Sequence, residues 1–383
     1  STDNIFGFSA VFAEGRNIKS GIIKPMAGKT IRKDVLFKDE NDSDDYDIII
    51  SNVIEKLSEI TGYSGINPKI IELPYSMKMT DTSFNSLLFF KPEYKQPKYS
   101  LKYERQIANQ LSREFVFSHF KVRTDFSEKT AEGLSGWIAD VVSEELFGQA
   151  EVSFRIAKYY PIYGLNFIDF NQIPVIYTLG VFYEPPYAMS LKKYYGNPVA
   201  GSISNDRRTF ISKKDEIISN KVIPSLVFHN LEREIGRERM IKLLKILFLE
   251  RKHANISADF LNGLIKKITG EDKDYLTELL SGKPAFYNNR IKEIIKRGKN
   301  KYYVVAERRG DGIYPSEIAL YTDKDTLIKK WDGKEVQSVI EFDTDNVVLG
   351  AEVDPARKNL FDLNFADNSY MLDSDYSSTF ALS

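Results

Sequence analysis

Two consecutive amphipathic helices, predicted over residues 107–142, constrain the fold of this chain more than any other feature. In the first, apolar side chains recur at helical spacing at Ile107, Leu111, Phe115 and Phe117. In the second, the same spacing holds for Leu134, Trp137, Ile138, Val141 and Val142. The polar residues between them include three types that favour helix starts, namely Asp125, Ser127 and Thr130. Taken alone, the stretch indicates two ordinary core-lining helices.

Composition limits the class of protein. With 383 residues, two to three domains of about 100–200 residues are expected. Hydrophobic residues make up 42% and charged residues 28%, which is typical of a globular protein with a sizeable core. A net charge of −1 gives no indication of nucleic-acid binding. No run of about 18 apolar residues predicts a membrane span, and no signal peptide is recognisable. We therefore expect an excised segment or a mature product.

Few residues are suited to bind a transition metal. The chain has no cysteine, which excludes disulfides, cysteine zinc sites and thiol catalysis. It has three histidines, His119, His229 and His253, and no two of them have a metal-ligand spacing. We expect His229 to be a residue of a helix face. A histidine-based site would have to bring these residues together from distant parts of the chain.

The order of the predicted elements divides the chain. Short strands are expected at residues 6–12, 21–23 and 35–37, then a helix over 44–61 and strands at 69–74 and 86–90. Beyond the central pair, helices are predicted at 217–236, 239–250, 257–270 and 274–280. From about residue 291 the apolar pattern alternates with period two, at residues 302–306, 317–321 and 336–342. This last part is expected to form a small β-sandwich.

The central pair resembles the active-site helices of the aminopeptidase N type of gluzincin zinc peptidases. Those enzymes carry H-E-x-x-H on one helix and a glutamate ligand on the next, in an E-G-L or E-T-L context. In this sequence, the H-E-x-x-H positions match residues 109–113, and the third ligand matches Glu132 in Ala131-Glu132-Gly133-Leu134. The resemblance extends over nearly the whole chain. It implies an α+β fold with a thermolysin-like peptidase domain (1–212), a helical subdomain (213–290), a β-sandwich (291–370) and a tail (371–383).

The residues that the enzymes need are replaced. Asn109 is a poor zinc ligand, Gln110 is no general base, and Arg113 brings a permanent positive charge to the second histidine position. Only Glu132 is retained. We therefore expect no catalytic residues, no metal site and no zinc, and we predict an ion pair between Arg113 and Glu132 in place of the metal.

Two further family features are missing. The G-x-M-E-N motif, whose glutamate holds the substrate's amino end in the aminopeptidases, matches residues 75–81, Tyr-Ser-Met-Lys-Met-Thr-Asp. The catalytic tyrosine of the family has no counterpart in residues 218–222. Tyrosines at 159–163, 183–187 and 194–195 are candidates for lining a peptide cleft or, alternatively, for packing within loops.

The C-terminal part most resembles bacterial proteins in which a peptidase-like unit is joined to an ABC transporter permease. This resemblance implies an extracytoplasmic module tethered to a membrane, with a peptide or protein ligand in the former cleft. One alternative is an active metallopeptidase with an atypical metal site built from Glu114, Glu128 and Glu132. Another is a plain scaffold without a ligand.

Overall fold

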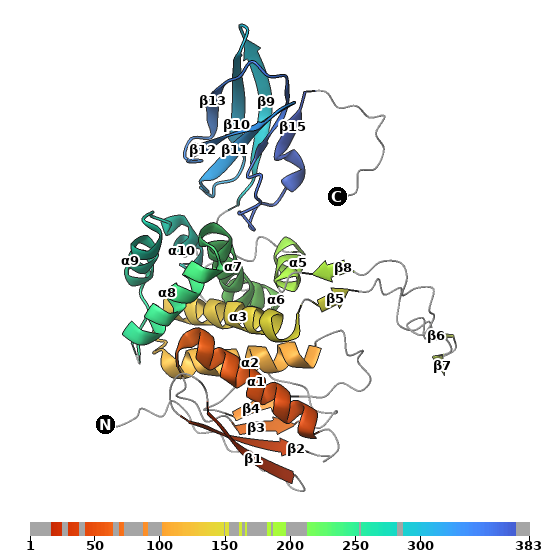
Figure 1. The fold of residues 1–383 in the computed structure, drawn as a ribbon, viewed down its shortest axis with the longest axis vertical. Helices are drawn as coiled ribbons and strands as arrows, with labels where there is room; N and C mark the ends of the chain where they lie inside the picture. Colours follow the sequence, from red (N-terminus) through yellow and green to blue (C-terminus); the bar gives the residue numbers. More distant parts are fainter. Residues whose placement is uncertain are drawn as a thin grey trace. The chain divides into compact units, whose positions relative to one another are not determined.

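The computed structural model describes residues 17–24, 30–37, 43–63, 69–72, 87–90, 102–148, 150–152, 161–162, 165–166, 182–184, 187–196, 213–252, 254–281 and 286–372. The chain forms two compact units (Figure 1). The first consists of Ser1–Ser190 and Ile241–Ser257, and the second of Leu191–Met240 and Ala258–Ser383. The predicted strand at 6–12 lies outside the described residues.

A four-stranded sheet forms one side of the first unit. Its strands are β1 (Asn17–Ile23), β2 (Ile31–Phe37), β3 (Lys69–Glu72) and β4 (Leu87–Phe90), in the order β1-β2-β3-β4. β1 and β2 are antiparallel, whereas β3 runs parallel to β2 and β4 parallel to β3. The strands predicted near 21–23, 35–37, 69–74 and 86–90 are confirmed.

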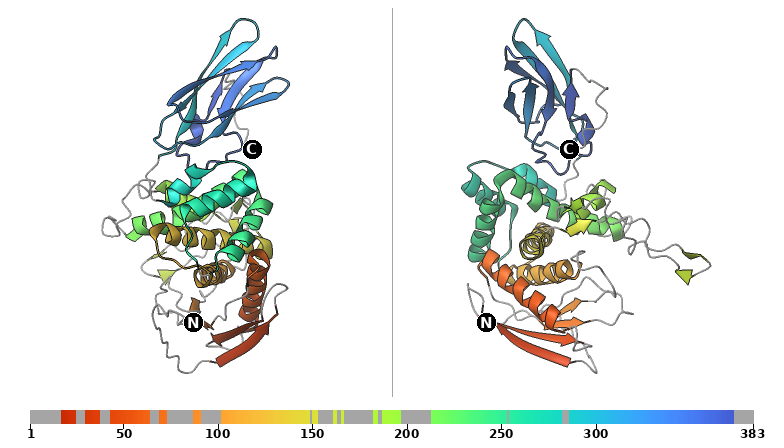
Figure 2. Two further views of the ribbon diagram at one scale, coloured as in Figure 1. Left: turned by 90° about the vertical axis from the view of Figure 1, so that its left-hand side faces the viewer. Right: turned by 45° about the vertical axis from the view of Figure 1, so that its right-hand side comes forward.

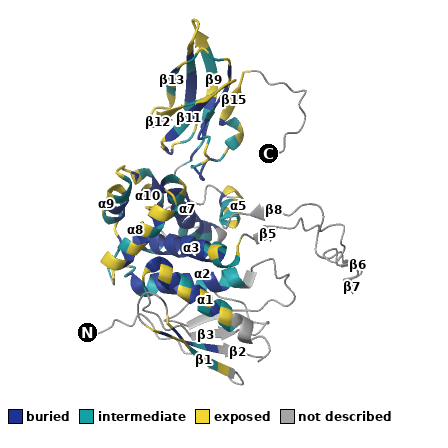
Figure 3. Ribbon diagram, viewed as in Figure 1, coloured by how far each residue is buried: buried dark blue, intermediate teal, exposed yellow. Residues whose placement is uncertain are grey.

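Three helices complete the core of the first unit: α1 (Ser43–Thr61), α2 (Lys102–His119) and α3 (Asp125–Phe147). Their apolar faces are buried, as the dark bands of Figure 3 show. Beneath α1, the Nζ of Lys33 on β2 lies 2.5 Å from Oδ1 of Asp47 and 2.5 Å from Oγ of Ser51. This buried contact ties the sheet to the start of α1. The unit also holds the short strand pairs β5 (Ala150–Val152) with β8 (Phe182–Glu184), and β6 (Pro161–Ile162) with β7 (Leu165–Asn166).

Three helices of the second unit agree with the prediction: α7 (Ile223–Ile235), α9 (Ala258–Thr269) and α10 (Asp274–Leu280). Two further helices were not predicted, namely α5 (Ala188–Gly196), whose first residues belong to the first unit, and α6 (Lys213–Ile217). Helix α8 (Arg237–Glu250) begins in this unit, and its residues from Ile241 on belong to the first. The predicted helix at 217–236 contains a π-helical segment, η5 (Ile218–Val222), that the apolar spacing did not indicate.

The predicted β-sandwich is present in the second unit (Figure 2). One sheet has the order β13-β10-β9, formed by Gln337–Asp343, Lys301–Arg308 and Asn289–Arg297. The other has the order β12-β11-β14-β15, formed by Thr326–Trp331, Ser316–Thr322, Val348–Val353 and Ser369–Met371. Alternate side chains from both sheets fill its core, among them Val304, Leu320, Phe342 and Val353. The helices up to Leu280 are followed by the antiparallel sheets of the sandwich, and the α+β class is confirmed.

Candidate functional site

Helices α2 and α3 carry the four residues that match the peptidase motif, namely Asn109, Gln110, Arg113 and Glu132. Ile107, Leu111 and Phe115 are buried on one face of α2, and Leu134 and Trp137 are buried on α3. Burial of these faces aligns the two helices and brings Arg113 to Glu132, which is 19 positions along the chain. The apolar spacing therefore determines which polar side chains meet.

Arg113 and Glu132 form the predicted ion pair. The Nη2 of Arg113 lies 2.6 Å from Oε1 of Glu132, and its Nε lies 3.1 Å from the same oxygen and 3.4 Å from Oε2. The side chain of Glu132 is 9% exposed and that of Arg113 26%. The guanidinium also stands over the ring of Phe117, 4.3 Å from its centroid. The carboxylate is thus engaged on both oxygens by a cation that cannot lose its charge.

The first two residues that match the H-E-x-x-H positions differ in their surroundings. Asn109 is exposed, and its Nδ2 donates a hydrogen bond to the backbone oxygen of Arg105, 2.8 Å away. Gln110 is half-buried. With one imidazole position taken by an amide and the other by a guanidinium held on the carboxylate, these residues do not fit a zinc ion.

The other acidic residues proposed for an atypical metal site are not arranged for one. Within the part of the chain that the structure describes, no group of three or more His, Asp or Glu side chains could hold a metal ion. Glu114 is buried on α2, whereas Glu128 and Glu132 lie one turn apart on α3. Next to Glu128, the buried Lys129 forms an ion pair with Asp125, its Nζ 3.3 Å from Oδ2.

The histidines are packing residues where they are described. The Nε2 of His119 lies 2.6 Å from the backbone oxygen of Phe248, and its ring stacks on the ring of that phenylalanine. His229 lies on α7 and is 4% exposed, consistent with the expected helix-face role. His253 lies outside the described residues, as do residues 75–81, which match the amino-end anchor.

Two of the tyrosines considered for a peptide cleft have a structural role. Tyr194 is 3% exposed, and its hydroxyl donates to the backbone oxygen of Phe361, 3.3 Å away. The hydroxyl of Tyr195 donates to the backbone oxygen of Leu360 at 2.9 Å. Both therefore hold a loop within the second unit, and Tyr194 is a packing residue, whereas 38% of Tyr195 is exposed. Residues 159–160, 163–164 and 185–186 lie outside the described residues.

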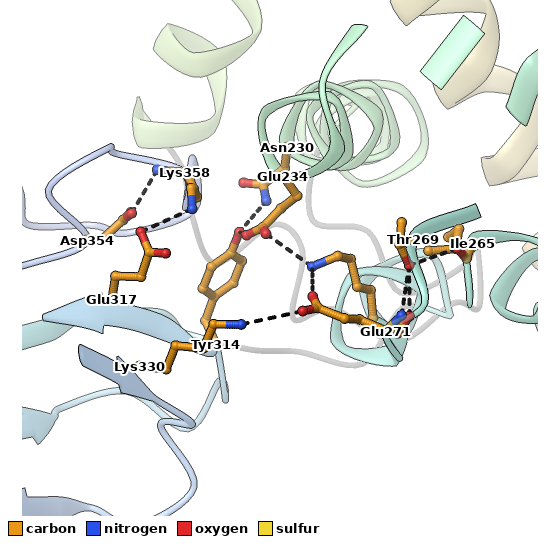
Figure 4. Close-up of polar contacts among 11 residues, drawn as sticks. Asn230, Glu234, Ile265, Thr269, Glu271, Tyr314, Glu317, Lys330, Asp354 and Lys358 are labelled. Atoms are coloured by element: carbon orange, nitrogen blue, oxygen red, sulfur yellow. Dashed lines mark hydrogen bonds and ion pairs between the residues drawn. The ribbon is translucent and has the colours of Figure 1, made fainter. Parts of the chain in front are cut away.

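Sequence reasoning missed a buried polar cluster in the second unit. The side chains of Asn230 and Glu234 on α7 meet Tyr314 of the sandwich (Figure 4). These partners are separated by 84 and 80 positions. A period of buried and exposed positions specifies a face, and it does not specify which distant residue lies against it. The local sequence pattern therefore did not predict the contact of Asn230 and Glu234 with Tyr314.

Comparison with solved structures supports a peptidase-like fold. Aminopeptidase A of Legionella pneumophila, in complex with aspartic acid, superimposes with a TM-score of 0.55 at 10% sequence identity. The match covers 91% of this chain and 38% of that one. An M1 zinc metallopeptidase of Deinococcus radiodurans gives a TM-score of 0.43 at 14% identity, over 70% of this chain and 50% of that one.

At such identities the likeness concerns the fold alone. The chain is similar in fold to aminopeptidase A, and it spans 38% of the length of that protein and about half of the length of the Deinococcus radiodurans protein. No protein-family model matches the sequence, and no curated protein matches it. Among the described residues, no helix is both long and apolar enough to cross a membrane.

Proposed function

We propose that this chain is a pseudopeptidase, a metallopeptidase-like module without the catalytic metal chemistry. The observation that carries the proposal is the contact between Arg113 and Glu132. At the one position where a family ligand is retained, the carboxylate accepts two hydrogen bonds from a guanidinium. A dication at this carboxylate would face the permanent positive charge of Arg113, whose Nη2 lies 2.6 Å from Oε1 of Glu132.

The chemistry of the neighbouring positions supports the same conclusion. An amide at Gln110 cannot take a proton from water, so a hydrolytic step would lack its general base. Asn109 is turned to its own backbone through the hydrogen bond to Arg105. The losses concern a base and two ligands, which act together in the enzymes, and loss of any one of them would already impair peptide hydrolysis.

The role that we propose for the module is recognition or structure. It binds a peptide or protein in the former cleft, or it serves as an extracytoplasmic part of a membrane-tethered, transporter-type protein. The sequence resemblance to peptidase-like units joined to bacterial ABC transporter permeases supports the second role. The likeness in fold to aminopeptidase A of Legionella pneumophila, solved in complex with aspartic acid, supports the first.

Back-mutation tests the alignment on which the proposal depends. The triple variant Asn109→His, Gln110→Glu, Arg113→His restores the full ligand set with Glu132, and we expect it to bind one zinc ion. A matched quadruple variant that also carries Glu132→Gln should bind zinc far more weakly. Failure of the triple variant to bind, while its circular dichroism stays native, would refute the assignment of these positions.

Peptide hydrolysis tests the proposed inactivity directly. We expect the unmodified chain to leave a mixed peptide library intact, with or without added zinc. Cleavage that a chelator abolishes would overturn the proposal. The recognition role is tested with the same library by NMR, because the Arg113 Nε–H and Asn109 Nδ2 signals report on the former site. Peptides that bind there should shift these signals, and the absence of any shift would contradict that role.

A further inference from the structure

A buried polar cluster joins the helices of the second unit to its β-sandwich (Figure 4). We call it the junction cluster and define it as Asn230, Glu234, Lys273, Tyr275 and Tyr314. Tyr314 precedes β11 of the sandwich, and the other four lie on α7 or at the start of α10. Its residues are at most partly exposed, and Asn230 and Tyr314 are 0% and 1% exposed.

Glu234 is the centre of the junction cluster. Its Oε1 accepts a hydrogen bond from the hydroxyl of Tyr314 at 2.5 Å, and its Oε2 lies 3.2 Å from the Nζ of Lys273. Burial, and then the charge of Glu234, raise the pKa of Tyr314 well above its usual range. The hydroxyl therefore remains a donor at physiological pH. The ring of Tyr275 packs edge-on against that of Tyr314, 5.0 Å between centroids.

Asn230 connects the cluster to a second part of the sandwich. Its Nδ2 donates to the hydroxyl of Tyr314 at 2.6 Å, and its Oδ1 accepts from the backbone N–H of Leu360 at 2.7 Å. The buried amide of Asn230 thus binds both Tyr314 and Leu360, which are 46 positions apart in the sequence. Both ends of the amide are satisfied, which makes the arrangement directional.

The loop that carries Leu360 is itself held in an unusual conformation. Asp354 and Arg357 have positive φ angles, 53° and 48°, a region that non-glycine residues rarely adopt. The carboxylate of Asp354 accepts the backbone N–H groups of Lys358 and Asn359 at 2.9 and 2.8 Å. The backbone oxygen of Arg357 accepts a hydrogen bond from Arg233 on α7. Contacts within the sandwich therefore fix the conformation of this loop, and Arg233 of helix α7 binds it.

A third attachment lies at the surface. The Nζ of Lys330 on β12 is 3.4 Å from Oε1 of Glu271, whose Oε2 is 3.3 Å from the Nζ of Lys273. Glu271 and Lys330 are largely exposed, so this contact contributes little energy by itself. It does place a third segment of the sandwich against the helices. The sandwich is thus attached to the helices at three separate segments, which carry Tyr314, Leu360 and Lys330.

We infer that the junction cluster is a lock that makes the β-sandwich and helices α7, α9 and α10 one rigid body. Because a buried ion pair costs desolvation, an apolar contact would have held the two parts together at a lower cost in free energy. Hydrogen bonds and ion pairs, however, require a specific geometry of their partners. What the polar cluster supplies is orientation. Any movement of the sandwich is therefore passed to α7 and to the π-helical segment η5 that precedes it. This inference is independent of the proposed loss of catalysis.

The absence of cysteine makes a distance measurement straightforward in the full chain. Spin labels are attached through Lys267→Cys on α9 and Lys299→Cys in the turn between β9 and β10, both exposed positions. Electron–electron double resonance is recorded with Tyr314→Phe, which removes one hydroxyl from the lock. The matched control is Tyr321→Phe, whose hydroxyl donates to Glu352 within the sandwich at 2.7 Å. A second label pair at Lys299→Cys and Lys334→Cys reports on the sandwich alone.

The expected result is a narrow distance distribution in the parent chain and in Tyr321→Phe, and a broad one in Tyr314→Phe. The distance distribution of the label pair within the sandwich should stay narrow in all three proteins. The backbone amide of Leu360 should exchange hydrogen about tenfold faster in Tyr314→Phe. Glu234→Gln should give the same broadening if Tyr314→Phe folds poorly. Equal widths in all variants, or equal broadening by Tyr321→Phe, would overturn the inference.

Discussion

Arg113 and Glu132 show how far single residues could be predicted. Their pairing was predicted because both residues match zinc-ligand positions of the peptidases that the sequence resembles. The buried apolar faces of α2 and α3 explain why the two side chains meet. The start of α3 was less well predicted. Its N-cap is Thr124, whose side-chain oxygen accepts the backbone N–H of Ser127, with Ser127 completing a capping box. Asp125 and Thr130 are the right residue types, but they lie inside the helix.

A double-mutant cycle measures the coupling between these two residues. Arg113→Leu leaves the carboxylate of Glu132 buried without its main cation, so we expect a loss of about 1–3 kcal/mol in the free energy of unfolding. Arg113→Leu with Glu132→Leu should recover most of that loss. Arg113→Lys is the matched control, because it keeps the charge and removes the bidentate geometry. Additive single effects in urea unfolding would mean that the pair is not coupled.

Asp362 provides a prediction about pH. It is 1% exposed, and burial raises the pKa of its carboxyl to about 6, although three N–H donors at 3.1–3.5 Å oppose the shift. The folded-state pKa exceeds the unfolded value of about 3.9, so the folded chain holds the proton more tightly. Its stabilising contribution is present at about pH 4 and is lost as the pH rises through about 6.

Asp362→Asn isolates this contribution. The difference in unfolding free energy, parent minus variant, should fall as the pH rises from about 4 to 7, by at most about 3 kcal/mol. The measurement is urea unfolding of both proteins across that range. A difference that stays constant or grows with pH would contradict the assigned burial of the carboxyl.

Whole elements were predicted better than their irregularities. The central helices, the helical segments after residue 217 and the sandwich strands all follow from periodicity, because burial of one face imposes a period on the sequence. The π-helical segment η5 was missed, since one extra residue in a turn leaves the apolar pattern nearly unchanged. Attachment of the sandwich through Tyr314 was missed for another reason, because it joins residues that are far apart in sequence.

Two glycine-to-alanine substitutions should have opposite effects on the elements that contain them. At Gly310, after β10, an added Cβ would lie 1.7 Å from the backbone oxygen of Phe286, so Gly310→Ala must displace backbone. We expect a loss of about 2 kcal/mol or more. At Gly263, within α9, an added Cβ meets no atom within 4 Å, and Gly263→Ala should stabilise by about 0.5–1 kcal/mol. If the melting temperatures of the two variants shift in the same direction, the described close approach at Gly310 is contradicted.

At the scale of the whole molecule, the fold was more predictable than the function. The order of sheet, central helices, helical part and sandwich could be read from the sequence, and a structure of 0.55 TM-score at 10% identity shares the fold. Chemistry depends on a few side chains, and in this chain two residues that match zinc-ligand positions, Arg113 and Glu132, form an ion pair. The fold is therefore peptidase-like, while the proposed function rests on residues 109, 110, 113 and 132.

The metal content of the purified protein distinguishes a pseudopeptidase from an active zinc enzyme. The protein is expressed with zinc in the medium, freed of loosely bound ions by gel filtration, and measured by inductively coupled plasma mass spectrometry. We expect zinc far below one ion per chain, with no other transition metal in stoichiometric amount. One tightly bound zinc per chain, lost together with peptide cleavage on chelation, would contradict it.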